Sequence, residues 1–206
     1  YKLNKKNTIN IGAVYTLGRT LHGDAYKYHQ TGAESNGSIY VQSQTGDTIP
    51  NPFKMPHTFG IGLTYVYDNR LTIGVDYTLQ KWNTADLAWS KFNKESVEMN
   101  SRTKIAFGAE FVPSYISHNY LKRIRYRMGA YYSSPYNKVS YTSPDTGTTS
   151  FQDGAREYGV SIGFGLPMFQ SKSMLNISGQ YIKVSPKFKG LMEENYLRIN
   201  IGLTFN

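Results

Sequence analysis

The sequence predicts an all-β fold: a transmembrane antiparallel β-barrel, with about eight strands in this chain as part of a larger up-and-down barrel. Three observations lead to this prediction. Apolar and polar residues alternate with a period of two in segments of about ten residues. The connections between these segments are short and long in turn. Aromatic residues lie near both ends of the segments, as in the two interfacial girdles of outer-membrane barrels.

Residues 196–206 show the alternation most clearly. One face of this segment is apolar throughout, and the other carries polar residues or glycine; the apolar face holds Leu197, Ile199, Ile201, Leu203 and Phe205. Its length of about ten residues is what a tilted strand needs to cross a bilayer. A half-buried strand of a soluble sandwich alternates in the same way. A sandwich, however, explains neither the aromatic girdles nor the asymmetry of the connections.

Earlier segments repeat this pattern, and the first seven residues are expected to be the tail of a preceding strand and a tight turn. Strands are predicted over residues 9–18, 58–67, 71–80, 104–111, 123–132, 158–166 and 175–181. Short connections at 68–70, 113–122 and 167–173 are expected to be periplasmic. Long external loops are expected at 19–57, 81–101, 135–154 and 184–194. Within the first of these, residues 26–30 and 38–44 are expected to extend strands above the membrane.

The composition restricts the remaining possibilities. No stretch approaches the length of about 18 consecutive apolar residues that a transmembrane helix needs. The absence of cysteine excludes disulfides and thiolate metal sites. A net charge of +9 indicates an anionic neighbour, for which membrane lipids and lipopolysaccharide are the expected partners. The basic residues are scattered rather than gathered on a helix, so no nucleic acid is expected.

Three segments carry a resemblance to a known family: Glu193-Glu194-Asn195-Tyr196 through Phe205-Asn206, residues 159–167 and residues 70–77. With these segments the chain resembles the C-terminal part of FadL-type outer-membrane transporters of long-chain fatty acids and hydrophobic compounds. The resemblance implies a wider barrel with an N-terminal hatch, and passive uptake through it. Because the sequence starts at Tyr1 without a secretory leader, we expect either a processed protein or part of a longer chain.

Arginines on the inner face of the fifth strand are the first candidate ligand-binding residues. Arg125 and Arg127, together with Arg123, are expected to project into the lumen. Glu110 falls opposite Arg125 if Phe111 pairs with Ile124. One interpretation is a structural ion network, and the other is a fixed positive field that receives a carboxylate or another anion.

The second candidate group lies on the loop of residues 81–101. It consists of apolar side chains on a presumed external surface: Trp82, Leu87, Trp89 and Phe92. Exposed apolar clusters often mark binding surfaces, and the family resemblance implies a capture groove on such loops. Alternatively, Trp82 is a girdle residue and the other three pack the loop on itself.

Inward-facing glycines are the third feature: Gly12, Gly60, Gly62, Gly74, Gly108, Gly159, Gly163, Gly165 and Gly202. They either permit barrel curvature or leave space for a hatch or an apolar ligand.

The sequence shows no motif for catalysis. The histidines His22, His29, His57 and His118 lack metal-ligand spacing, and no Gly-x-Ser-x-Gly motif occurs. We therefore predict no enzyme activity, no metal and no cofactor. The predicted function is passive uptake of hydrophobic small molecules, such as long-chain fatty acids, across the cell outer membrane. The alternative is an accessory or structural barrel subunit of a larger outer-membrane complex, with outer-membrane proteins as partners, or a surface adhesin.

Overall fold

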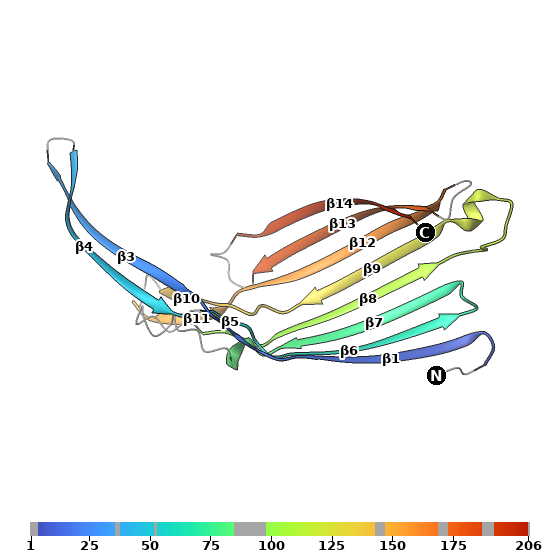
Figure 1. Cartoon of the computed structure of the whole chain (residues 1–206), viewed down its shortest axis with the longest axis horizontal. Helices are drawn as coiled ribbons and strands as arrows, with labels where there is room; N and C mark the ends of the chain where they lie inside the picture. Colours follow the sequence, from blue (N-terminus) through green and yellow to red (C-terminus); the bar gives the residue numbers. More distant parts are fainter. Residues whose placement is uncertain are drawn as a thin grey trace.

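The computed structural model describes residues 4–35, 38–51, 53–84, 98–142, 147–168, 173–186 and 192–205. Its main element is an eight-stranded antiparallel sheet in the order β1-β6-β7-β8-β9-β12-β13-β14 (Figure 1). The strands are β1 (Asn7–Thr16), β6 (Thr58–Tyr67), β7 (Leu71–Gln80), β8 (Arg102–Phe111), β9 (Arg125–Ser133), β12 (Ala155–Pro167), β13 (Met174–Pro186) and β14 (Glu194–Thr204). The all-β fold and its antiparallel strands are thus confirmed.

The register of the sheet separates an apolar face from a polar one. Leu63 pairs with Val75, and Ile61 pairs with Tyr77, across β6 and β7. The pairing continues across the whole sheet, so that one apolar row crosses every strand: Ile11, Leu63, Val75, Phe107, Ala130, Val160, Tyr181 and Leu197. These rows are the product of the period-two alternation, because successive side chains point to opposite faces.

The apolar face is not covered by protein. Ile11 is 72% exposed, Val160 56% and Leu197 76%. In the described part of the chain, the buried hydrophobic residues are limited to Ile49, Val112, Ile124 and Ile182. A soluble protein rarely leaves an apolar surface of this extent open to water, whereas hydrocarbon covers it in a membrane.

Aromatic rings border this face at both ends of the strands. Tyr126 and Phe164 meet at 5.9 Å between ring centroids near the ends joined by short connections, called here the turn end. Tyr132 and Tyr158 meet at 5.2 Å towards the opposite end, the loop end. The two pairs are six residues apart along β9 and β12, which is about 20 Å of strand. Their positions match the predicted girdles.

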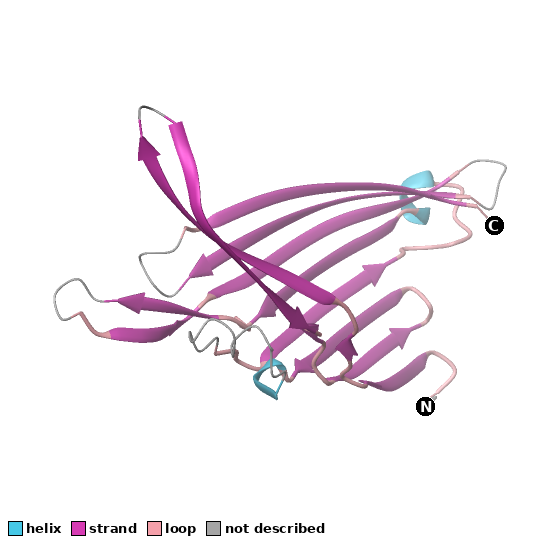
Figure 2. Ribbon diagram, turned by 60° about the vertical axis from the view of Figure 1, so that its left-hand side comes forward, coloured by secondary structure: helices cyan, strands magenta, loops and turns pink. Residues whose placement is uncertain are grey.

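The sheet is curved but not closed (Figure 2). Within the described residues, β1 and β14 each pair with one neighbour, β6 and β13 respectively. No helix in this part of the chain is long and apolar enough to cross a membrane.

The start of the fifth strand of the sheet was predicted wrongly. Arg123 lies in the 3-10 helix η2 (Tyr120–Arg123) rather than on a strand. Ile124, which was expected to face lipid, is buried. The strand starts later than predicted because residue 119 caps a helix. The Asn119 side chain accepts a hydrogen bond from the amide of Leu121 at 3.0 Å, and the 3-10 helix η2 begins there. As a result, Phe111 pairs with Tyr126 and not with Ile124.

The predicted long loops contain strands of their own. Residues 26–30 and 38–44 do not extend barrel strands; they lie in a separate hairpin of β3 (Asp24–Ser35) and β4 (Ser38–Pro50). Figure 1 shows this hairpin standing away from the sheet at the loop end. At its base lie the short strands β2 (Thr20–Leu21) and β5 (Phe53–Lys54). A further hairpin joins β10 (Lys138–Thr142) to β11 (Thr149–Asp153).

Candidate functional site

The polar face of the sheet carries the candidate site, and glycine lines much of it. The register places all the predicted inward glycines on this face, and Gly74, Gly108 and Gly129 lie next to one another on β7, β8 and β9. A hollow of about 510 Å³ lies over β1, β6 and β7, with Gly12, Gly60 and Gly62 among its lining residues. Few side-chain atoms therefore cover the polar face of the sheet where these glycines are aligned.

Some glycines accommodate a larger side chain from the neighbouring strand. A Cβ at Gly159 would clash with the Tyr131 ring, and a Cβ at Gly62 would clash with the Asp76 carboxylate. Nothing lies within 4 Å of a Cβ at Gly12 or Gly202. The glycines thus serve two purposes: some allow close cross-strand packing, and others leave open space.

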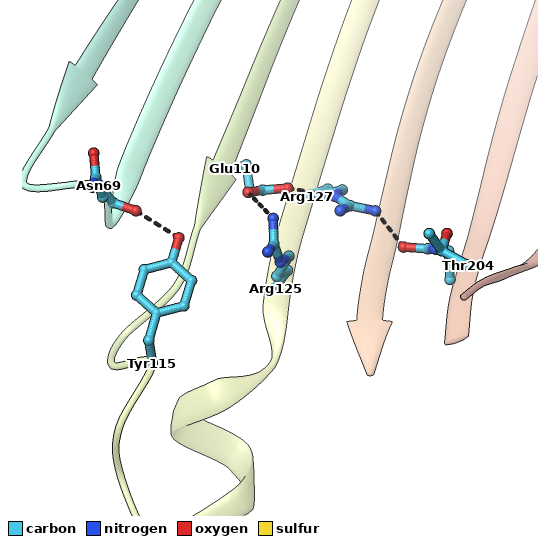
Figure 3. Close-up of polar contacts among 7 residues, drawn as sticks. Asn69, Glu110, Tyr115, Arg125, Arg127 and Thr204 are labelled. Carbon is cyan, nitrogen blue, oxygen red and sulfur yellow. Dashed lines mark hydrogen bonds and ion pairs between the residues drawn. The ribbon is translucent and has the colours of Figure 1, made fainter. Parts of the chain in front are cut away.

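A charged network crosses the polar face near the turn end (Figure 3). Both oxygens of Glu110 are used: Arg125 Nη1 donates to Oε1 at 3.2 Å, and Arg127 Nε donates to Oε2 at 2.7 Å. Arg127 Nη1 also donates to Asn176 Oδ1 at 2.7 Å, and Asn176 Nδ2 donates to Thr204 Oγ1 at 3.3 Å. The network therefore connects β8, β9, β13 and β14.

The register of this network differs from the sequence prediction. Glu110 lies directly opposite Arg127 and not opposite Arg125. It still reaches both guanidinium groups, because Arg125 follows on the same face. Glu110 is 26% exposed, and the two arginines are 34% and 37% exposed. One carboxylate between two arginines leaves a net positive charge on the polar face of the sheet. The ligand role of Arg125 and Arg127 stays a prediction.

Aromatic contacts tie the network to the turn below it. The Arg125 guanidinium lies 5.9 Å from the centroid of the Tyr115 ring. The Tyr115 hydroxyl donates to the backbone carbonyl of Asn69 at 2.6 Å (Figure 3). The connection between β8 and β9 is thereby joined to the hairpin turn between β6 and β7.

A second polar cluster lies on the same face towards the loop end and was not predicted. Tyr131 donates a hydrogen bond to Glu157, and Arg102 lies 3.6 Å from the same carboxylate. Arg102 Nε donates to Ser133 Oγ at 2.7 Å, and Lys104 Nζ lies 4.4 Å from the centroid of the Tyr131 ring. This cluster depends on a register across three strands that aligns Lys104, Ser133 and Glu157.

The predicted ligand-binding residues do not form one site. Trp82 lies in the 3-10 helix η1 (Trp82–Thr84) at the loop end, whereas Arg125 and Arg127 lie at the turn end. The Trp82 ring is 5.5 Å from that of Tyr136, and its Nε1 donates to Gln80 Oε1 at 3.2 Å. The other three members of the apolar loop cluster, Leu87, Trp89 and Phe92, fall outside the described residues.

Comparison with known families gives a match over the full sequence. The BamG family model matches residues 1–206. The chain belongs to the BamG family. Comparison with curated proteins finds no match.

Two solved structures share the fold of this BamG family member. One is the P. putida toluene transporter TodX, with a TM-score of 0.52 and 15% sequence identity, covering 98% of this chain and 45% of TodX. The other is the TodX deltaS2S3 mutant, described as a monoaromatic hydrocarbon channel, with a TM-score of 0.53 and 16% identity over 98% and 46% of the two chains. The chain thus spans less than half the length of these structures.

The comparisons refine the predicted resemblance. TodX is FadL-like, so the resemblance to FadL-type transporters holds for the fold, whereas BamG is a distinct family. The eight-stranded sheet has the fold of part of an outer-membrane barrel, and the outer-membrane location is confirmed.

Proposed function

We propose that the protein is a barrel subunit of an outer-membrane protein complex, which is the alternative function predicted from the sequence. The observation that carries this proposal is the β3–β4 hairpin. Its strands of 12 and 13 residues pair with each other and with no other strand in the described part of the chain. An isolated two-stranded ribbon is marginally stable in water, so a ribbon of this length is expected to rest on another protein. The family name, which points to the BAM complex, supports the same role.

The side chains near the base of the hairpin suit a protein contact. Tyr26 and Tyr28 share one face of the ribbon and are exposed, and the Tyr28 ring lies over Gly46 of the paired strand. Exposed tyrosine is enriched where proteins bind one another, because it buries a large rigid surface at low entropic cost. The opposite face carries Lys27 and His29.

Purification of the tagged protein from its native outer membrane tests this proposal. We expect stoichiometric partner proteins with the unmodified chain, and their loss with the double variant Tyr26→Ser and Tyr28→Ser. The matched control, Lys27→Ser and His29→Ser, changes the opposite face of the same strand and should retain the partners. If the unmodified protein purifies alone from mild detergent, the subunit role is wrong.

A second candidate function is passage of hydrophobic small molecules such as long-chain fatty acids. The glycine-lined polar face favours it, since a narrow barrel would need its interior filled by side chains, and TodX is named as a toluene transporter. If the protein has this function, membrane lipids surround the barrel and the hydrophobic molecules enter at the loop end.

The double variant Gly74→Phe with Gly108→Phe would fill the space over the polar face of the sheet. It should reduce uptake at least about tenfold, whereas serine at both positions should not. Equal uptake by both variants would exclude this route.

A further inference from the structure

A hollow at the loop end remains outside both proposed functions. It measures about 360 Å³ and is lined by Lys54, Pro56, His57, Phe59 and Lys81, among others. Phe59 belongs to the apolar face, in the row with Tyr15 and Leu79. Lys81 follows Leu79 by two residues. The hollow therefore lies at the rim of the face that meets lipid, at the level expected for headgroups.

Within the described part of the chain, the two lysines of this hollow have no acidic partner. Among the described residues, neither Lys54 nor Lys81 forms an ion pair. Lys81 Nζ lies 5.9 Å from the centroid of the Phe59 ring, which holds its charge beside the hollow. At the opposite end, by contrast, Arg70 lies 3.6 Å from Asp68. Two uncompensated cations in one hollow favour an anion.

The hydrogen bonds of His57 indicate which of its two ring nitrogens can donate to a ligand. Its Nδ1 lies 3.3 Å from the amide of Gly18 and 2.7 Å from the Tyr15 hydroxyl. A backbone amide can only donate, so Nδ1 is the acceptor and the proton of the neutral ring is on Nε2. Nε2–H is then available to an oxygen ligand.

Apolar side chains continue from the hollow onto the lipid-facing surface. The Tyr15 and Phe59 rings lie 4.9 Å apart, and both residues are exposed. Leu17, Phe53 and Met55 are also exposed at this end of the sheet. A ligand that joins an anionic group to hydrocarbon would match both parts of this surface.

We propose that this hollow binds the phosphate of a membrane lipid in the leaflet at the loop end. Lys54 and Lys81 each bind a phosphate oxygen, and His57 Nε2–H donates a hydrogen bond to a third phosphate oxygen. The acyl chains lie against the rings of Tyr15 and Phe59. Ammonium groups pair with phosphate through charge-assisted hydrogen bonds. This inference does not depend on either proposed function.

Lipid retention by the reconstituted protein tests the site. The protein in neutral vesicles is supplied with phosphatidic acid, with diacylglycerol of the same chains, or with inorganic phosphate, and bound lipid is measured by native mass spectrometry. We expect phosphatidic acid to be retained about tenfold better than diacylglycerol, and Lys54→Gln with Lys81→Gln to remove this preference.

The matched control is Lys5→Gln with Lys6→Gln, which removes the same charge at the turn end and should leave retention unchanged. Retention of phosphatidic acid and diacylglycerol to the same extent would overturn the phosphate site. So would an unchanged preference in the Lys54 and Lys81 variant. Competition by inorganic phosphate at equal concentration would show a site for soluble anions and overturn the lipid assignment.

Discussion

Glu110 is the residue on which the turn-end network depends, because it accepts from two arginines on the next strand. Glu110→Gln keeps the shape but leaves the positive charges of Arg125 and Arg127 without a counterion. Since all three groups are about a quarter to a third exposed, we expect a loss of about 1–2 kcal/mol in unfolding free energy. Urea unfolding in vesicles measures this loss.

The two arginines can also separate the structural role from a ligand role. Arg127→Ala should destabilise more than Arg125→Ala, because Arg127 makes two contacts at 2.7 Å and Arg125 makes one ion pair at 3.2 Å. Normal uptake by Arg125→Ala together with a lower melting temperature would rule out a ligand role for that residue. Unchanged stability in all three variants would contradict the network.

Gly159 provides a second prediction at the level of single residues. Gly159→Ala places a Cβ against the Tyr131 ring and disturbs its hydrogen bond to Glu157. A cost of about 1–3 kcal/mol is expected from such overpacking. At Gly108 the nearest atom to an added Cβ is 4.0 Å away, so Gly108→Ala is the control and should be tolerated. Thermal unfolding of the two variants makes the comparison, and an equal effect would be inconsistent with the packing described.

Part of the candidate site could be predicted from the sequence. Arg125, Arg127 and Glu110 were predicted because the period-two alternation alone assigns each of them to a face of its strand. The position of Arg123 was predicted wrongly, because the Asn119 cap overrides the alternation there. The cluster of Tyr131 and Glu157 was also missed, because strand register is a property of pairs and not of single segments.

The turn between β6 and β7 supports a prediction at the level of elements. Asp68 and Asn69 have φ values of 48° and 53°, as a two-residue hairpin turn with left-handed residues requires. Asn69→Val should cost about 1–2 kcal/mol, because a β-branched residue resists positive φ. Asn69→Gly should be neutral or stabilising. The Tyr115 contact is to the backbone of Asn69 and survives both changes. Equal stability of the valine and glycine variants in thermal unfolding would argue against this turn.

The strands of the sheet were predictable, whereas the hairpins in the loops were not. A strand with one face in lipid needs strict alternation, so β6 and β7 have the predicted bounds. The β3–β4 ribbon carries polar groups such as Lys27, Gln30 and Gln44 among its tyrosines. Because neither strand of this ribbon has a continuous apolar face, the sequence does not indicate which segments pair. Only residues 26–30 and 38–44 of the ribbon were predicted to be strands.

At the scale of the whole molecule, the exposed apolar face and the unclosed sheet have one explanation. In the described residues few hydrophobic side chains are buried, and the rows that cross the sheet lie open. In a bilayer, hydrocarbon covers such rows, but backbone groups at a sheet edge must be paired. We therefore expect β1 and β14 to be paired in the membrane, which is compatible with a subunit of a larger assembly.

The central claim is that hydrocarbon covers the apolar face, and a cysteine scan of β6 tests it most directly. The sequence contains no cysteine, so single substitutions from Phe59 to Val66 each carry one spin label without further change. In lipid vesicles, labels at Ile61, Leu63 and Tyr65 should be accessible to lipid-soluble oxygen, and labels at Gly62 and Thr64 to a water-soluble nickel complex. The accessibility should alternate with a period of two. Equal access of the nickel complex to both sets would show water, not lipid, on the apolar face and would contradict this account.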